Sequence, residues 1–555
     1  MTTHPAQPNP AVAPAVESVT GTRVAFVGAG PGDPGLLTVR ARDYLAAADV
    51  VLLDTVHDEE AVRRLTGAEV RLVDAAHGSS GQSLTQGSRA KLLVRTAQKQ
   101  APEGGLVVRL MNGDPAAFSG LATEALACRK AGIPFEVVPG VSAAWSVPAY
   151  AGVPLTTEDG HEVHIVDGAD PRTDWTRSAS EDVTVVVLGD APGLRRALTG
   201  LRQAGRDGQT PVCLTVNGTT TTQQTRVTVL EEALAALATD EEGQGHSPTV
   251  AVVGRQVELR EELSWFETKP LFGWHVLVPR TKDQAGSMVE RIGSYGATAS
   301  VVPTISVEPP RTPQQMDRAI RGLVTGRYEW IGFTSVNAVR AVREKFEVLG
   351  LDARAFAGLK IAAVGGVTAD SLREWGLEPD LVPEGEQSAR GLLEAWSPYD
   401  EVLDPINRVF LPRADIATDT LVAGLQEMGW EVDDVTAYRT VRAAPPPAPV
   451  REAIKSGAFD AVCFTSSSTV RNLVGIAGKP HASTVVACIG PATAKTAEEH
   501  GLRVDVVAPE ASGDALVDAL AEFAAQTAAE LQQAGEPVLR PSERRPRRNG
   551  SRSRA

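Results

Sequence analysis

A glycine-rich turn near the N-terminus carries the first chemical signal in this sequence. Residues 27–33 read VGAGPGD, and the alternating glycines permit positive φ and a close approach of the backbone to a ligand. With Asp54 at the end of the next apolar segment, the pattern is similar to a dinucleotide-binding fingerprint. However, Asp33 stands at the third glycine position, and Pro31 stands where a helix N-terminus should offer free N–H groups. A nucleotide-dependent oxidoreductase therefore stays an open alternative, to be tested by binding of a nicotinamide cofactor.

Turns rich in hydroxyl groups and glycine form a second group of candidate ligand sites, in the C-terminal half. Trp330–Val339 reads WIGFTSVNAV and Ala461–Val470 reads AVCFTSSSTV, and a second pair of similar segments begins at Ala363 and Cys488. Each copy predicts a strand, a turn of small residues and a helix, so the sequence indicates two related lobes. Helix N-termini with Ser or Thr caps attract anions. Ordinary helix capping explains any single turn, but repetition in both lobes favours a cleft for a ligand with several anionic groups.

Short apolar strands alternate with helical segments along the chain. The first predicted elements are a strand at Thr22–Gly28, a helix over Pro34–Ala48 and a strand at Val50–Asp54. This alternation predicts an α/β architecture with largely parallel sheets. An amphipathic helix over Val257–Phe266 should end the first half, because the proline that follows cannot continue a helix. The main domain boundary is expected near residue 270.

The composition is that of a globular chain. Its 555 residues predict three or four domains, and its 43% hydrophobic and 22% charged residues exclude intrinsic disorder for most of the chain. No apolar run is long enough to span a membrane. The four cysteines are widely spaced and form no CxxC pair, which predicts a cytoplasmic protein and argues against a structural metal site.

Charge is distributed unevenly along the chain. The net charge is −15, whereas the residues from Arg540 onward hold seven arginines and a single glutamate. The acidic body argues against nucleic acid as the main partner, and residues 530–555 are expected to form a disordered basic tail. Residues 1–20 are rich in proline and alanine and lack the apolar core of a signal peptide, so they are expected to be a disordered leader.

The glycine-rich turn belongs to a longer series of segments that occur in order over residues 21–267. The segments are VGAGPGDPGLLTVRA (27–41), ADVVLLD (48–54), VVRLMNGDP (107–115), AGIPFEVVPGVSAAWSVPAYAGVPLT (131–156), VNGT (216–219) and AVVGRQVELREELSWFE (251–267). This series resembles the uroporphyrinogen-III C-methyltransferases of the tetrapyrrole methylase family. The resemblance implies a two-lobed α/β fold that binds S-adenosyl-L-methionine between its lobes and methylates uroporphyrinogen III to precorrin-2.

The resemblance also implies roles for individual residues. Asp114 would accept hydrogen bonds from the cofactor ammonium, and Leu188 and Gly218 would lie near its adenine and ribose. Methyl transfer needs mainly positioning, and Asp54 is the catalytic candidate that would take up or hold a proton. The implied cofactor-binding residues are Pro31, Asn112, Gly113, Asp114, Ala117, Ser142, Ala143, Leu188 and Gly218.

The substrate side departs from the family pattern. Asn112 replaces the first glycine of a Gly-Gly-Asp-Pro motif, and residues 118–124 replace a run similar to Phe-Gly-Arg-Gly-Gly-Glu-Glu. A basic Gly-Lys-Arg segment that would face the substrate carboxylates is here Asp74–His77, so the lysine proposed as proton donor is missing. Each lost cation should cost on the order of 1 kcal/mol of substrate binding. Two interpretations stay open, namely an active methyltransferase and a retained scaffold without activity.

The C-terminal half has a resemblance of its own over residues 272–525. The repeated turns, together with VLVPRT (276–281), LPRAD (411–415) and VTAYRT (435–440), resemble uroporphyrinogen-III synthase. This resemblance implies closure of hydroxymethylbilane to uroporphyrinogen III, with loss of water and inversion of ring D through a spiro intermediate, and without a metal or an organic cofactor. Positioning and a grip on eight carboxylates are expected to dominate this chemistry.

The expected synthase site residues follow strand ends in both lobes. Tyr438 is the catalytic candidate, as a proton donor to the departing hydroxyl group. The expected substrate-binding residues are Arg280, Thr334, Ser335, Asn337, Gly365, Thr368, Arg413, Thr465, Ser466, Ser467, Gly490 and Thr493.

The two resemblances imply a plan for the whole chain. A tetrapyrrole methylase-like domain is expected at 21–268 and a synthase domain at 272–525. Lobe one of the synthase should take 272–303 and 440–525, and lobe two should take 304–437. The synthase product is the methyltransferase substrate, so the fusion makes metabolic sense. The expected binding partners are the tetrapyrroles hydroxymethylbilane and uroporphyrinogen III, and no membrane association is expected. A homodimer is expected to form through the methylase domain. The remaining alternative is a two-lobed sensor of an anionic metabolite, which would not turn over hydroxymethylbilane.

Overall fold

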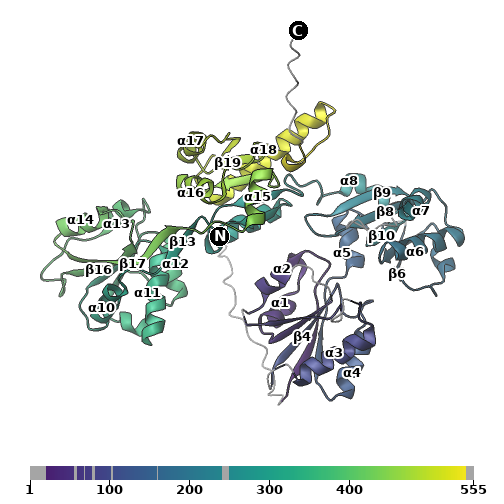
Figure 1. Ribbon diagram of the computed structural model, residues 1–555, viewed down its shortest axis with the longest axis horizontal. Coiled ribbons are helices and arrows are strands. Elements are labelled where there is room, and N and C mark those ends of the chain that lie inside the picture. The colour runs from purple at the N-terminus through teal and green to yellow at the C-terminus, as the bar shows by residue number, and fades with distance from the viewer. Residues whose placement is uncertain are drawn as a thin grey trace, which may run out of the picture. The chain divides into compact units, whose positions relative to one another are not determined.

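The chain forms two compact units (Figure 1). The first unit ends at Gly273 and includes Tyr295–Ala297, and the second takes Trp274–Ser294 and the residues from Thr298 onward. This division lies next to the boundary expected near residue 270. The computed structural model describes residues 21–54, 59–67, 69–77, 82–99, 101, 104–158, 160–239 and 249–544. Within these ranges, no helix combines the length and the apolar character needed to cross a membrane.

The first sheet of unit one is wholly parallel, with the strand order β3-β2-β4-β1-β5. Its strands are β1 (Arg23–Gly28), β2 (Val50–Leu53), β3 (Arg71–Asp74), β4 (Leu106–Met111) and β5 (Phe135–Val138). Side chains of α1 (Val39–Ala46) and α2 (Glu59–Leu65) pack on one face, and those of α3 (Gln86–Lys99) and α4 (Leu121–Lys130) pack on the other. Because both faces are covered, β2 and β4 are buried throughout. All carboxyl ends meet at one edge, which is where such sheets bind ligands.

The second sheet of unit one is mixed, with the order β6-β7-β10-β8-β9. Its strands are β6 (Glu162–Asp167), β7 (Val183–Leu188), β8 (Pro211–Val216), β9 (Gln224–Val229) and β10 (Val250–Val253). The pair β6–β7 is parallel and the other three pairs are antiparallel. The prediction of largely parallel sheets is wrong here, because a short loop between β8 and β9 reverses the chain. Helices α6 (Ala191–Gln203) and α7 (Leu230–Thr239) cover one face, and α5 (Ala143–Tyr150) covers the other.

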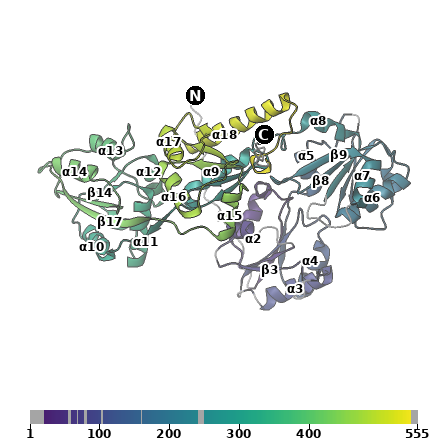
Figure 2. The same cartoon turned by 45° about the horizontal axis from the view of Figure 1, so that its top comes forward.

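Unit two contains two further sheets, which form separate lobes (Figure 2). One sheet is wholly parallel, in the order β12-β11-β18-β19-β20, and consists of β11 (His275–Val278), β12 (Thr298–Val301), β18 (Ala461–Phe464), β19 (Val485–Cys488) and β20 (Val506–Val507). The other has the order β13-β17-β16-β14-β15 and consists of β13 (Ile305–Glu308), β14 (Trp330–Phe333), β15 (Lys360–Ala363), β16 (Arg408–Ala414) and β17 (Glu431–Arg442). Only β13 runs antiparallel to its neighbour. Where the chain crosses between the lobes, the Ala443 N–H donates to the Thr304 carbonyl oxygen at 3.2 Å.

The internal repeat seen in the sequence is a repeat of structure. Strands β14 and β15 are parallel neighbours that lead into α11 (Val336–Leu349) and α12 (Gly366–Glu374). Strands β18 and β19 are parallel neighbours that lead into α16 (Ser467–Ala477) and α17 (Pro491–Glu499). The other helices of unit two are α9 (Lys282–Ser294), α10 (Pro313–Val324), α13 (Ala389–Ala395), α14 (Thr420–Glu427), α15 (Ala448–Ser456) and α18 (Gly513–Gln533). The α/β class is therefore confirmed for both units.

Two predicted helices differ from the observed ones in unit one. Pro34–Ala48 is interrupted, because the Thr38 side chain caps a new helix, α1, by accepting the Ala41 N–H at 3.1 Å. The helix expected over Val257–Phe266 is a 3₁₀ turn followed by the single turn of α8 (Arg260–Leu263). It ends early because the segment after it packs on α5, where the Trp265 indole N–H donates to the Ala149 carbonyl oxygen at 2.9 Å.

The prediction of disorder from residue 530 is wrong as far as residue 544. Helix α18 continues to Gln533, and Pro541–Glu543 forms a 3₁₀ turn. The Ser542 N–H anchors this turn by donating to Asp460 Oδ1 at 2.8 Å. The predicted leader, residues 1–20, and the end of the tail, from residue 545, lie outside the described residues.

Candidate functional site

Three glycines bring the carboxyl ends of β1, β4 and β5 into direct backbone contact. A Cβ atom on Gly28 would lie 2.5 Å from Gly140 Cα and 2.7 Å from the Gly113 carbonyl oxygen. Gly113 also exchanges backbone hydrogen bonds with Gly30, at N–O distances of 2.9 and 3.2 Å. Any side chain at Gly28 or Gly140 would occupy this space. The three loops therefore form a narrow cradle of backbone. It lies beside β1, where successive connections of the chain leave toward opposite edges of the sheet.

Polar side chains fix the loop after β4. Asp114 Oδ2 accepts the Gly140 N–H at 2.9 Å, and its Oδ1 accepts the N–H two residues further on at 2.8 Å. The Ser119 hydroxyl lies within 3.2 Å of the carbonyl oxygens of Asn112, Asp114 and Ala117. The predicted cofactor residues of this loop are thus held by the protein itself. A carboxylate oxygen has two acceptor sites, so Asp114 can still bind an ammonium group.

The glycine-rich turn after β1 contacts the loop between β8 and β9. The Asp33 N–H donates to Thr219 Oγ1 at 3.1 Å, and the Tyr150 hydroxyl donates to Asp33 Oδ2 at 2.8 Å. A Cβ atom on Gly32 would lie 3.0 Å from the Gly218 carbonyl oxygen. Burial, together with the hydrogen bond and charge of Asp33, raises the pKa of Tyr150, so the phenol stays protonated and donates. The turn that contains Pro31 and the loop that contains Gly218 therefore lie side by side.

Helix α5 connects the two sheets at this point. Ser142 caps it by accepting the Ala144 N–H at 3.3 Å. Ala143 packs in the same apolar cluster as Leu188 from β7. A Cβ atom on Gly218 would lie 2.5 Å from the Val147 side chain. The structure thus brings together the predicted cofactor residues from both halves of the unit.

Backbone strain is concentrated at the same site. Across the described ranges, the non-glycine residues with positive φ are Phe118 (61°), Asn217 (49°) and Thr219 (68°). Thr219 is β-branched and 1% exposed, so its left-handed conformation is costly and must be offset by its contacts. Its N–H donates to Gln223 Oε1 at 2.7 Å. Strain of this kind persists mainly where a ligand or a reaction requires the geometry.

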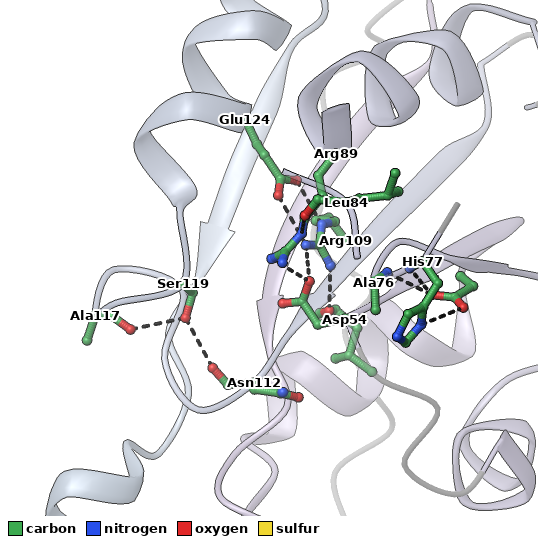
Figure 3. A network of polar contacts seen from close by, with 12 residues as sticks. Asp54, Ala76, His77, Leu84, Arg89, Arg109, Asn112, Ala117, Ser119 and Glu124 are labelled. Atoms are coloured by element: carbon green, nitrogen blue, oxygen red, sulfur yellow. Dashed lines mark hydrogen bonds and ion pairs between the residues drawn. The ribbon is translucent and has the colours of Figure 1, made fainter. Parts of the chain in front are cut away.

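A buried ion network lies at the end of β2 (Figure 3). Arg109 donates through Nε to Glu124 Oε2 at 2.7 Å and through Nη2 to Glu124 Oε1 at 3.1 Å, and Nη2 also bonds Asp54. Burial lowers the pKa of Arg109, but the hydrogen bonds and charges of Glu124 and Asp54 outweigh that effect and raise it. Arg89 Nη1 lies 3.5 Å from the same Asp54 oxygen. Asp54, predicted as a proton acceptor, therefore shares its carboxylate with two guanidinium groups.

The segment Asp74–His77, which replaces a basic segment of the family, forms hydrogen bonds among its own residues. Asp74 accepts the N–H groups of Ala76 and His77 at 2.7 and 3.1 Å, and its other oxygen lies 3.2 Å from His77 Nδ1. Burial raises the pKa of Asp74, but the hydrogen bonds from His77 and Ala76 outweigh it and lower that pKa. This segment carries an aspartate and a histidine that already pair with each other.

In unit two, four helix N-termini follow strand ends. Ser335 caps α11, and Ser466 caps α16 in a capping box with Thr469. Helices α12 and α17 begin after Gly365 and Gly490, which provide no side-chain cap. Each pair of helices starts at the carboxyl edge of a parallel sheet, where the helix dipoles favour anions.

Several of the predicted hydroxyl groups are already hydrogen-bonded inside unit two. Ser467 Oγ donates to the Ala492 carbonyl oxygen at 3.0 Å and accepts from Thr496 at 2.9 Å, so it ties α16 to α17. The hydroxyls of Ser335 and Tyr438 are 2.9 Å apart, and Tyr438 is 7% exposed. The predicted proton donor is therefore buried and hydrogen-bonded to Ser335, the more exposed of the two.

The two predicted substrate arginines of unit two differ in their surroundings. Arg413 is 5% exposed, forms an ion pair with Asp434 and donates to the Thr418 carbonyl oxygen at 2.6 Å, so its charge is used inside its lobe. Arg280, directly after β11, is half-buried and its side chain has no partner among the residues that the structure describes. Burial lowers the pKa of Arg280, and no carboxylate among the described side chains offsets that effect. Arg280 is thus available to an anion.

Comparison with known proteins accounts for both units. Residues 23–234 match the family model of the Tetrapyrrole (Corrin/Porphyrin) Methylases, and residues 286–518 match that of Uroporphyrinogen-III synthase HemD. The porphyrin biosynthesis protein HemD of Ruminiclostridium josui is 32% identical over 515 residues, which cover 90% of this chain and 98% of the relative. The chain belongs to the family in which a tetrapyrrole methylase precedes a uroporphyrinogen-III synthase. Unit one is its methylase domain, and unit two is its synthase domain.

Other proteins match one of the two domains. Siroheme synthase 2 of Aeromonas hydrophila is 37% identical over 250 residues, 44% of this chain, and the chain spans about half (51%) of that relative. A uroporphyrin-III-C-methyltransferase structure from Thermus thermophilus is 33% identical and covers 44% of this chain and 97% of its own, with a TM-score of 0.35. A uroporphyrinogen III synthase structure from the same organism is 20% identical and covers 46% and 99%, with a TM-score of 0.26. The chain is an enzyme of tetrapyrrole biosynthesis, which sets aside the oxidoreductase and sensor alternatives.

The remaining predicted residues of the synthase domain lie at the same helix starts. Thr334, Asn337 and Thr465 are partly exposed. Thr368 and Thr493 are each 4% exposed, in the first turns of α12 and α17, so they pack inward.

Several polar residues at these sites were not predicted from the sequence. In the synthase domain, Gln387 Oε1 accepts the Gly366 N–H at 3.2 Å and so covers the start of α12. In the methylase domain, Thr219 fixes the glycine-rich turn, and Arg89, Arg109 and Glu124 surround Asp54. Arg109 lies in the segment VVRLMNGDP (107–115), and Glu124 lies in residues 118–124. An arginine within the apolar run VVRLM is a signal that a counter-ion is needed.

Proposed function

We propose that the synthase domain closes hydroxymethylbilane to uroporphyrinogen III and that the methylase domain methylates this product to precorrin-2. The observation that carries the second half is that Thr219, a buried β-branched residue held at positive φ, hydrogen-bonds to the glycine-rich turn beside the cradle. A site kept under strain and free of side chains fits a bound, folded cofactor better than a relic scaffold. The match of residues 286–518 to the uroporphyrinogen-III synthase family supports the first half.

The residues of the methylase domain fit S-adenosyl-L-methionine. When bound, this cofactor supplies a methyl group on a positively charged sulfur. Asp114 would accept its ammonium group, and the backbone of the three loops that Gly28, Gly113 and Gly140 hold in contact would line its main body. Leu188 and Gly218 would face its adenine and ribose across α5. The protein then contributes mainly orientation of an acceptor carbon toward the donor.

In the synthase domain, we propose that Arg280 and the starts of α11, α12, α16 and α17 hold the substrate carboxylates. Charge-assisted hydrogen bonds from a half-buried arginine, and hydrogen bonds from backbone N–H groups at helix starts, suit this task. Tyr438 would pass a proton through Ser335 to the departing hydroxyl group, so that water leaves as the ring closes. Arg413 and Ser467 would act by holding the lobes in shape.

Separate assays on the full chain test the two halves. Supplied with hydroxymethylbilane, the chain should give the III isomer, and supplied with uroporphyrinogen III and S-adenosyl-L-methionine, it should give a dimethylated product. Asp114→Asn should abolish methyl transfer and leave cyclisation unchanged, whereas Arg280→Gln should raise the KM for hydroxymethylbilane and leave methyl transfer unchanged, so each variant controls for the folding of the other. Cyclisation without any methyl transfer in the natural chain would favour the inactive-scaffold alternative.

We also propose a homodimer through the methylase domain. Strand β5 is an edge of its sheet, and Phe135 and Val137 on it are 37% and 39% exposed. An apolar sheet edge of this kind is normally covered by a partner. Sedimentation of the chain should give a dimer, and sedimentation of Val137→Lys should give a monomer.

The four cysteines are buried thiols, which supports the proposed cytoplasmic setting.

A further inference from the structure

A polar pocket opens beside the ion network of the methylase domain. It has a volume of about 400 Å³ and is lined by Asp54, Gln86, Arg89, Asn112, Phe118 and Ser119. Phe118 and Ser119 also line an apolar groove of about 420 Å³, whose far end at Phe135 and Val137 belongs to the face proposed for the homodimer. A polar pocket with the apolar side chain of Phe118 at its rim suits a ligand that carries carboxylates on a flat apolar body.

Arg89 is the cation of this pocket that can bind a ligand. Its side chain is 27% exposed, whereas that of Arg109 is 0% exposed and is held by Glu124 and Asp54. The contacts of Arg89 are weak: Nη1 lies 3.5 Å from Asp54 Oδ1, an oxygen that Arg109 already binds, and Nε donates to the Leu84 carbonyl oxygen at 3.2 Å. Its Nη2 has no partner among the described residues, so a carboxylate can approach it.

Phe118 provides a second, independent observation at the same place. Its φ of 61° is unfavourable for an aromatic residue, yet its ring is 56% exposed at the junction of pocket and groove. A strained backbone that presents an apolar ring to solvent gains nothing for packing. Contact with an apolar ligand face explains why this geometry is kept.

We propose that Arg89 binds a carboxylate of the tetrapyrrole substrate while its macrocycle packs against Phe118. The inference rests on the proposed methyltransferase function and identifies its substrate subsite. It explains how the domain could bind a polyanion although Asp74–His77 lacks the expected cations. Asn112 lines the pocket and also belongs to the cofactor loop, so a substrate held here would lie next to the methyl donor.

The test compares Arg89→Gln with Arg95→Gln, which removes an exposed arginine from the same helix, α3, outside the pocket. Loss of a charge-assisted hydrogen bond should raise the KM for uroporphyrinogen III roughly 10- to 100-fold in Arg89→Gln. The kcat and the affinity for S-adenosylhomocysteine should stay unchanged, and Arg89→Lys should recover part of the loss. Arg95→Gln should match the natural chain, and cyclisation of hydroxymethylbilane should be unaffected in all variants.

A KM in Arg89→Gln equal to that of Arg95→Gln would overturn the inference, as would a lowered melting temperature as the sole effect. Binding of uroporphyrin III to the full chain, followed by fluorescence, separates the inference from the proposed activity. If the natural chain transfers no methyl group, weaker porphyrin binding by Arg89→Gln would uphold the carboxylate site alone. Equal binding by both variants would then reject the site together with the activity.

Discussion

Replacing Arg109 by methionine should destabilise the methylase domain by about 3–5 kcal/mol, the usual cost of breaking a buried ion pair. Arg109 is 0% exposed and donates to both oxygens of Glu124, at 2.7 and 3.1 Å, as well as to Asp54 and to the Leu110 carbonyl oxygen at 3.0 Å. Without it, Glu124 would be an uncompensated charge at 1% exposure. Most of the loss should therefore come from the stranded carboxylate.

A double variant separates the stranded charge from the lost packing. Replacing Glu124 by leucine together with Arg109→Met removes both charges and keeps apolar volume, so it should cost less than Arg109→Met alone. Hydrogen exchange of β4 peptides in the full chain measures the free energy of opening in this domain alone. Arg95→Met is the matched control at an exposed position and should change it by less than about 0.5 kcal/mol.

Two results would refute this reasoning. A cost below about 1 kcal/mol for Arg109→Met would mean that water or a neighbouring group solvates Glu124 readily. A double variant as unstable as the sum of the two single variants would mean that the charges are not coupled.

Other predictions follow from the same contacts. Gly28→Ala places a Cβ atom 2.5 Å from backbone, so it should cost about 1–3 kcal/mol of stability and weaken S-adenosylhomocysteine binding in calorimetry. Gly87→Ala, with open space around the added Cβ atom, should be neutral. Equal behaviour of the two variants would contradict the cradle. Arg280→Gln should raise the KM for hydroxymethylbilane roughly tenfold with little change in kcat, and an unchanged KM would remove Arg280 from the site. Burial lowers the pKa of His275 from 6.5, so the unfolded state binds the proton first and the stability of the synthase domain should fall as the pH drops below 6.5. His275→Gln should flatten that slope in unfolding titrations, and an unchanged slope would assign it to other groups.

The features that the sequence could predict are local ones. The strand, turn and helix around Trp330–Val339 and Ala461–Val470 follow from apolar runs and capping residues next to each other in the chain. The glycine-rich turn was likewise recognisable, because closely spaced glycines indicate close backbone contact. The boundary near residue 270 and the α/β class follow from local patterns of the same kind, whereas the identities and order of the domains follow from the resemblance of separate segments to two families.

The features that it could not predict depend on residues far apart in the chain. Asp33 meets Thr219 across 186 positions, and Arg109 meets Asp54 across 55. Asp54 looked like a free carboxylate because its counter-ion lies on another strand. Thr219 and Phe118 gave no signal, since their positive φ is imposed by the folded structure against their own preference.

The most direct test of the central claim is one incubation of the full chain with hydroxymethylbilane, with and without S-adenosyl-L-methionine, with products resolved by chromatography and mass. The proposed function predicts uroporphyrinogen III without the methyl donor and the dimethylated product with it. Uroporphyrinogen III in both reactions, with no methylated product, would contradict the methyltransferase. The spontaneously formed isomer I alone would contradict the synthase, and with it the account of Arg280 and the four helix starts.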